Sequence, residues 1–167
     1  MKSLRHLLAL IILSLVGSHS VLGAEDKLLE GETLGKLALG DKAEQLTKVI
    51  GKPSGKGKDE HWEATGEWVQ EWSFPAHGLK LNMASEKKGG AKLLSSITAT
   101  APCKLATSRG ITLGSTEAAV RKAYADVQDK EQSVPGETFV AGSIYGGAIF
   151  SLKDGKVVRI FIGAAAE

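Results

Sequence analysis

The chain is poor in cysteine: Cys103 is the only one among its 167 residues. No internal disulfide can form, so packing alone has to stabilise the fold. A single cysteine also excludes a metal cluster built from several thiolates. Cys103 lies in residues 101–105, between two stretches of regular pattern. We therefore expect a small, semi-buried apolar side chain at this position rather than a reactive nucleophile.

The sequence also lacks the short motifs that mark common catalytic and phosphate-binding sites. No Gly-x-Ser-x-Gly element offers a serine nucleophile, and no His-x-x-x-His pair offers a zinc site. The glycine-rich residues 51–57 and 142–147 do not match a phosphate-binding loop and are typical of turns. Surface loop residues, rather than metal ligands, are the better interpretation of Asp59, Glu60, His61 and His77. We expect no enzyme activity, no metal site and no cofactor.

Residues 1–24 have the pattern of a secretory signal peptide. Lys2 and Arg5 precede an apolar run at residues 7–16, and cleavage after Gly23 or Ala24 fits the small residues there. The run of about ten residues is too short to cross a bilayer as a helix. We expect a periplasmic or secreted protein with no stable membrane span after cleavage, and an uncleaved anchor is the alternative.

Removal of this segment leaves the chain without net charge. Lys2 and Arg5 are two of its 21 Lys and Arg residues, so 19 basic residues remain against 19 Asp and Glu. Without a positive field, nucleic acid is not an expected partner. Two lysine clusters remain, and we interpret both as solvated loop charge: Lys52, Lys56 and Lys58, and Lys87, Lys88 and Lys92.

What the sequence does contain is an internal repeat. Residues 35–51 align with residues 109–125 at a constant shift of 74 positions, without a gap. Leu37 then matches Ile111, and Gly40 matches Gly114. Each copy begins with an apolar-x-apolar-Gly pattern and continues with apolar residues at helical spacing. The repeat predicts two short helices of about ten residues, which are marginal alone and have to pack on another element.

The helix starts and the hairpins have local signals of their own. Asp41 and Ser115 follow the two glycines and are the expected N-cap residues. Period-two alternation after each helix predicts antiparallel strands. Asp154 and Gly155 predict a two-residue hairpin between the last two strands.

These patterns together predict an α+β fold made of two repeated units. Each unit is expected to pack a short helical element on a small antiparallel sheet of about four strands. The predicted boundaries are residues 1–24 for the signal peptide, 25–101 for the first unit and 102–167 for the second.

The segments around Gly40 and Gly114 resemble the entry signature of β-lactamase-inhibitor-like and outer-membrane-assembly-lipoprotein (SmpA/OmlA-type) domains. In these families a Gly-polar turn opens a helix that packs on an antiparallel sheet. The resemblance implies a tandem binding domain, as in the β-lactamase-inhibitor-like proteins. This sequence departs from the pattern at Asp41 and Ser115, which stand where a Met often follows the glycine. The resemblance therefore implies no β-lactamase target and carries over no binding residue.

All three tryptophans of the chain fall within residues 62–74. On a strand, Trp68, Trp72 and Phe74 share one face with Gln70 between them, and Trp62 precedes them. Aromatic side chains dominate interface hot spots, so these five residues are the candidate partner-binding set. The alternative is that they fill the core between helix and sheet.

The leading functional hypothesis is an exported, non-catalytic protein-binding module that uses an open sheet face. It would act as an inhibitor or as an envelope-assembly factor, with another exported or envelope protein as its partner. The alternative is a periplasmic carrier that holds a small apolar ligand.

Overall fold

The computed structural model describes residues 31–165 of the chain. The predicted signal peptide and the start of the first predicted unit lie outside these residues. The two α-helices of the described part are α2 (Ala43–Ile50) and α3 (Glu117–Ala123), and two short 3₁₀ helices are η1 (Pro75–His77) and η2 (Ala125–Val127). The strands are β1 (Thr33–Leu34), β2 (Leu37–Ala38), β3 (Gly55–Lys56), β4 (Glu60–Trp62), β5 (Glu67–Phe74), β6 (Leu79–Ser85), β7 (Leu93–Ala99), β8 (Gln128–Val134), β9 (Thr138–Ser143), β10 (Gly146–Lys153) and β11 (Lys156–Gly163).

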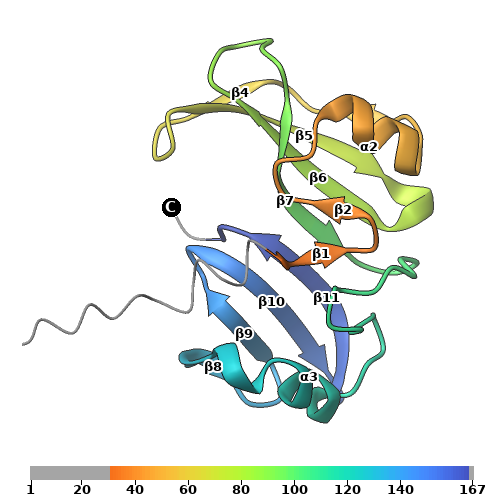
Figure 1. Cartoon of the computed structure of the whole chain (residues 1–167), viewed down its shortest axis with the longest axis vertical. Coiled ribbons are helices and arrows are strands. Elements are labelled where there is room, and N and C mark those ends of the chain that lie inside the picture. The colour runs from red at the N-terminus through yellow and green to blue at the C-terminus, as the bar shows by residue number, and fades with distance from the viewer. Residues whose placement is uncertain (1–30, 166–167) are drawn as a thin grey trace, which may run out of the picture.

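The predicted fold class is wrong, because the structure is mostly β: 47% strand and 16% helical. Nine strands of the described residues form one antiparallel sheet in the order β3-β5-β6-β7-β11-β10-β9-β8, with β4 also paired to β5. Strands from both expected units therefore belong to one sheet, not to two small sheets (Figure 1). Alternation in the sequence identifies strands, but it does not determine which strand edges pair.

The two groups of strands join where β7 meets β11 at the centre of the sheet (Figure 1). The junction consists of three antiparallel residue pairs: Ile97 with Ile162, Thr98 with Phe161 and Ala99 with Ile160. The isoleucines of these pairs belong to the one hydrophobic core. Burial of β-branched side chains on both strands is the physical reason for the continuous sheet.

The local correspondence between the two copies is present in the backbone hydrogen bonds. The Gly40 amide donates to the Leu94 carbonyl at 2.7 Å, and the Gly114 amide donates to the Val157 carbonyl at 2.8 Å. Both glycines adopt positive φ, 86° and 83°, where a side chain would be strained. Each turn thereby anchors the start of one helix to one of the two central strands.

The predicted N-caps are wrong by one residue, since the N-caps are Lys42 and Thr116. Asp41 and Ser115 instead use their side-chain oxygens to accept the amide three residues earlier, at 2.9 and 3.0 Å. These bonds close the glycine turn before each helix. A short polar side chain after a glycine fits both roles, and the sequence alone does not separate them.

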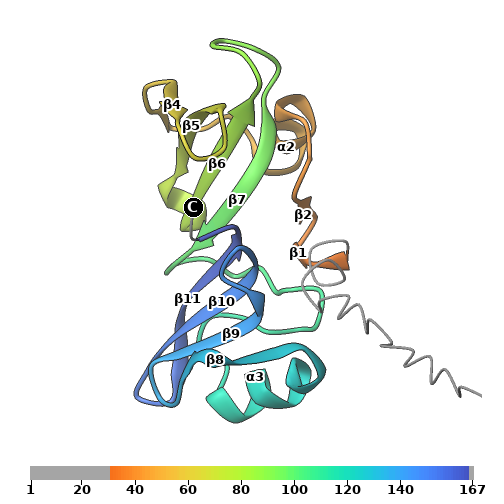
Figure 2. The same ribbon diagram turned by 90° about the vertical axis from the view of Figure 1, so that its left-hand side faces the viewer.

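The hydrophobic core lies between the sheet and a layer formed by α2, α3 and the β1–β2 hairpin, which lie on one side of the sheet (Figure 2). Leu46 of α2 and Val120 of α3 are both fully buried there. Cys103 is a buried member of this core, as predicted. The expected hairpin is confirmed: Asp154 and Gly155, both at positive φ, join β10 to β11.

A buried carboxylate ties the start of the described chain to the second half. Glu32 is 2% exposed, and its carboxylate accepts from the Thr33 amide and from both the amide and the hydroxyl of Ser108. It also accepts from the Tyr124 hydroxyl at 3.0 Å, which in turn lies 2.8 Å from the Thr107 hydroxyl. Burial raises the pKa of the Tyr124 phenol, so Tyr124 remains a proton donor to this carboxylate.

Candidate functional site

The sheet face opposite α2 and α3 carries no α-helix of residues 31–165 (Figure 2). This surface, the helix-free face, is the candidate site. Directly opposed residues of antiparallel strands share a face, so the register identifies its side chains. They include Trp62, Val69, Glu71, Asn82, Thr98, Ile149, Arg159 and Phe161.

The second half of this face presents an arginine on an apolar platform. The guanidinium carbon of Arg159 lies 5.2 Å from the centre of the Phe161 ring. Phe161 is only 7% exposed, and its cross-strand neighbours are Ile149 and Thr98. The Arg159 guanidinium therefore lies over a buried aromatic side chain and is not fully surrounded by water.

Arg159 differs from the other two arginines of the described chain. Arg109 and Arg121 each lie 2.6 Å from a carboxylate oxygen, of Asp126 and Glu117 respectively. The ion pairs within residues 31–165 do not include Arg159. Burial lowers the pKa of the Arg159 guanidinium, which stays charged at neutral pH. The helix-free face thus holds a half-buried charge that no carboxylate of residues 31–165 pairs with.

The first half of the face contains a hollow of about 340 Å³. Trp62 and Val69 supply its apolar surface, and Lys58, Glu60, Glu71 and Asn82 supply its polar groups. A hollow that combines an aromatic wall with acidic groups suits an apolar or basic side chain from a partner.

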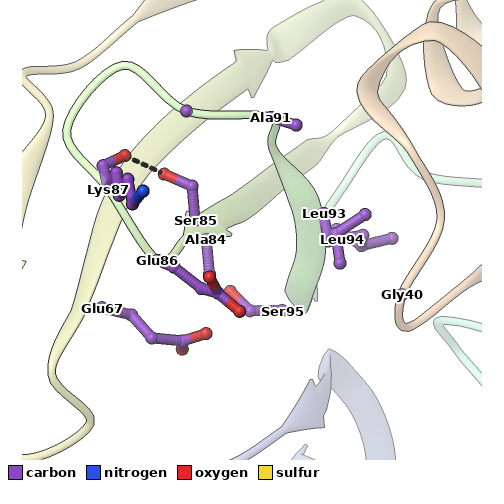
Figure 3. A pocket seen from close by; sticks show the side chains of 11 residues that line it. Gly40, Glu67, Ala84, Ser85, Glu86, Lys87, Ala91, Leu93, Leu94 and Ser95 are labelled. Carbon is purple, nitrogen blue, oxygen red and sulfur yellow. Dashed lines mark hydrogen bonds between the residues drawn. The ribbon is translucent and has the colours of Figure 1, made fainter.

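A second hollow, of about 600 Å³, lies beside the loop that joins β6 to β7 and is shown in Figure 3. The side chains of Glu67 and Glu86 point toward the Ser95 side of this hollow (Figure 3). Ser85 instead donates to the Lys87 carbonyl at 2.9 Å. The lining contains no histidine or cysteine that would serve as a base or nucleophile beside the carboxylates. The charged residues of its lining are Glu67, Glu86 and Lys87.

The five predicted partner-binding residues do not lie on one surface. Trp68, Gln70, Trp72 and Phe74 share a face as predicted, but it is the face toward the helices. Trp72 and Phe74 are 5% and 2% exposed and belong to the core. Trp62 lies opposite Glu67 and therefore on the helix-free face.

The half-buried members of the stripe have polar neighbours. Gln70 accepts from the Trp72 indole at 2.8 Å and donates to the Gly57 carbonyl at 2.9 Å. The Lys56 ammonium lies 3.8 Å from the centre of the Trp72 ring. Lys56 is exposed, as predicted, but it lies in strand β3 rather than in a loop, and its ammonium packs on an indole face.

Trp68 lies in a corner formed by a buried ion pair and two further side chains. The Lys92 ammonium pairs with the Asp59 carboxylate and donates to the Trp68 carbonyl at 2.8 Å. The ring of Trp68 lies 5.3 Å from that of His61 and 5.1 Å from the Lys88 ammonium. The Lys92 side chain is only 9% exposed, so its predicted role as solvated charge is wrong.

The residues considered as metal ligands are also separated. Asp59 pairs with Lys92, His61 lies 3.0 Å from Glu63, and His77 ends η1. Among the residues that the structure describes, no three His, Cys, Asp or Glu side chains gather in a geometry for a metal ion.

The ion pair between Asp59 and Lys92 predicts a specific acid sensitivity. The hydrogen bond from Lys92, together with that from the Gly89 amide, holds the pKa of Asp59 below its usual value. A carboxyl whose pKa is lowered by folding stabilises the protein above the unfolded pKa of about 4, and this stability is lost as the pH falls through the folded value. We expect Asp59→Asn to be less stable near neutral pH and to lose less further stability on acidification. Urea unfolding at a series of pH values measures this.

Asp154→Asn is the matched control, because Asp154 is exposed in the β10–β11 turn. Its acid dependence is expected to follow that of the unmodified protein. The same acid dependence in Asp59→Asn as in the unmodified protein would contradict the role of this ion pair.

Sequence reasoning missed Arg159, although a signal was present. Arg159 is the only charged residue within residues 157–162, an otherwise apolar strand segment. A lone cation in such a strand has to lie at a surface, and the period of the strand assigns it to the face of Phe161. The alternation alone does not reveal whether a carboxylate lies across the sheet.

Within residues 31–165 no helix has both the length and the apolar composition needed to cross a lipid bilayer. Comparison of the chain with protein-family models, with curated proteins and with solved structures gives no match.

Proposed function

We propose that the protein is an exported, non-catalytic binding module that engages another exported or envelope protein through the helix-free face. The observation that carries this proposal is Arg159, a half-buried arginine stacked on Phe161 with no carboxylate beside it among the described residues. The expected export rests on the pattern of residues 1–24.

Arg159 supplies the anchor of the proposed interface. A carboxylate from a partner would receive two parallel N–H bonds from the planar guanidinium. Exclusion of water by the partner would strengthen this attraction, because the effective dielectric constant falls. The contact with Phe161 would restrict the Arg159 side chain before binding, so less side-chain freedom would be lost when the bond forms.

The first half of the face would supply the second contact. Trp62 and Val69 line a hollow suited to an apolar side chain, and Glu60 and Glu71 border it. The face thus favours a partner that presents a carboxylate toward Arg159 and an apolar or basic side chain toward Trp62. Trp72 and Phe74 support this surface from the core and are not part of the contact.

Substitution of Arg159 tests the proposal. We expect Arg159→Ala to weaken the complex with the envelope partner by about 2 kcal/mol, or about thirtyfold, as is usual for a central arginine anchor. Crosslinking from position 149 of the face identifies the partner, and surface plasmon resonance then measures the affinity.

Arg121→Ala is the matched control. Arg121 also lies over an aromatic ring, that of Phe139 at 5.8 Å, but it belongs to α3 and pairs with Glu117. The control should bind within about twofold of the unmodified protein. Equal affinity of the Arg159→Ala and unmodified proteins, with both folded, would exclude the helix-free face as the docking surface.

A further inference from the structure

A pocket on the helix-covered side is independent of the helix-free face. It has a volume of about 430 Å³ and lies between α2, the β1–β2 turn, η1 and residues 102–105. Its size falls within the usual range of about 300–1,000 Å³ for small-molecule sites. Four separate segments of the chain meet at this pocket, so its shape depends on the tertiary fold.

The walls of the pocket are aliphatic. Leu79 is a core residue at its base, and Ile50 and Leu105 pack against the same core. Val49 of α2 is 46% exposed here, which is unusual for a valine in a helix that packs on a core. The Gly35 backbone approaches Leu105 so closely that a Cβ at position 35 would lie 3.0 Å from its side chain. The wall is therefore closely packed at Gly35 and Leu105 and exposed to solvent at Val49.

The only charged side chains that line the pocket are those of two lysines. Lys36, His77 and Lys104 line it, and none of the lining residues is acidic. The ion pairs of the described residues include neither Lys36 nor Lys104. The mature chain has no expected net charge, so a pocket with two lysines and no carboxylate is a local departure from the average.

We propose that this pocket binds a single-chain amphiphile with a carboxylate head, such as a medium-chain fatty acid. The alkyl chain would cover Val49, Ile50 and Leu105, and the carboxylate would lie between the ammonium groups of Lys36 and Lys104. Apolar burial would supply most of the affinity, and the lysines would set the preference for an anionic head group.

Isothermal titration calorimetry with octanoate, decanoate and dodecanoate, below their micelle concentrations, tests the apolar part. One molecule should bind per chain, with affinity rising about fourfold for each methylene that the pocket buries. A constant affinity across the three chain lengths, or binding of many molecules per chain, would overturn the proposal.

Charge-removing variants test the head-group part. The double variant Lys36→Gln with Lys104→Gln should bind dodecanoate about tenfold more weakly and dodecanol within about twofold of the unmodified protein. The double variant Lys122→Gln with Lys130→Gln removes the same charge from exposed positions of α3 and β8, outside the pocket, and should bind both ligands unchanged. Equal loss of dodecanoate affinity in the two double variants would overturn the assignment to this pocket. Because these measurements use no protein partner, their outcome is separate from that for Arg159.

Discussion

Phe150→Ala is expected to lower the free energy of unfolding by about 3–5 kcal/mol, the usual cost of truncating a buried phenylalanine. Phe150 is fully buried on β10 and is packed between two other rings. Its ring centre lies 5.0 Å from that of Tyr124 and 6.3 Å from that of Phe139. The cost is large because strands β9 and β10 hold their backbone in register and prevent the cavity from closing.

Equilibrium urea unfolding followed by circular dichroism measures this difference. Val158→Ala on β11 is the control, since Val158 is 45% exposed and its truncation should cost well under 1 kcal/mol. A loss below about 1.5 kcal/mol for Phe150→Ala would show that this aromatic cluster does not form the centre of the core.

Glu32→Ala should cost about 2–4 kcal/mol, because four hydrogen bonds to one buried carboxylate are lost together. The Tyr124 hydroxyl would lose its carboxylate partner and keep only the Thr107 hydroxyl, and the Ser108 amide would lose its side-chain partner. The loss should be local as well as global. Native-state hydrogen exchange should show faster exchange at Gly35, whose amide donates to the Ala106 carbonyl beside this network.

Two companion variants define the origin of this effect. Tyr124→Phe removes one of the four bonds and should cost about 1–2 kcal/mol, less than Glu32→Ala. Glu44→Ala removes an exposed acid from the first turn of α2 and should cost less than about 1 kcal/mol. If Glu32→Ala were no more destabilising than Glu44→Ala, the hydrogen bonds of the Glu32 carboxylate would not stabilise the contact between β1 and residues 107–108.

The sequence predicted local features better than their assembly. The shift of 74 positions matched Gly40 to Gly114, and both glycines make the same hydrogen bond to a central strand. Strand alternation placed Trp68, Trp72 and Phe74 on one face, as found. Neither pattern indicates which face the helices cover, because a helix packs on whichever face buries more apolar area. The stripe was therefore a candidate surface in the sequence and is largely core in the structure.

Contacts between distant segments could not be predicted. Strand β7 can pair with β11 only if no other strand occupies the edges at which they meet. A single sequence does not specify which strand edges remain free. Glu32 and Tyr124 are 92 positions apart, and nothing near Glu32 in the sequence distinguishes it from a surface acid. Arg159 was visible as a lone charge in an apolar strand. That the ion pairs of residues 31–165 do not include it is a property of the assembled sheet.

The edge strands of the sheet determine whether another chain can add a strand to it. At one edge, β8 carries Asp129, Lys130 and Glu131, and its pairing with β9 is interrupted between Asp129 and Val134. The other edge is divided between β3 and β4, which contain only two and three residues. Charged, interrupted or very short edges do not template the addition of a further strand, which protects a wide antiparallel sheet from edge-to-edge aggregation. A partner is accordingly expected to recognise side chains on the flat of the sheet, because the backbone edges offer it no continuous ladder.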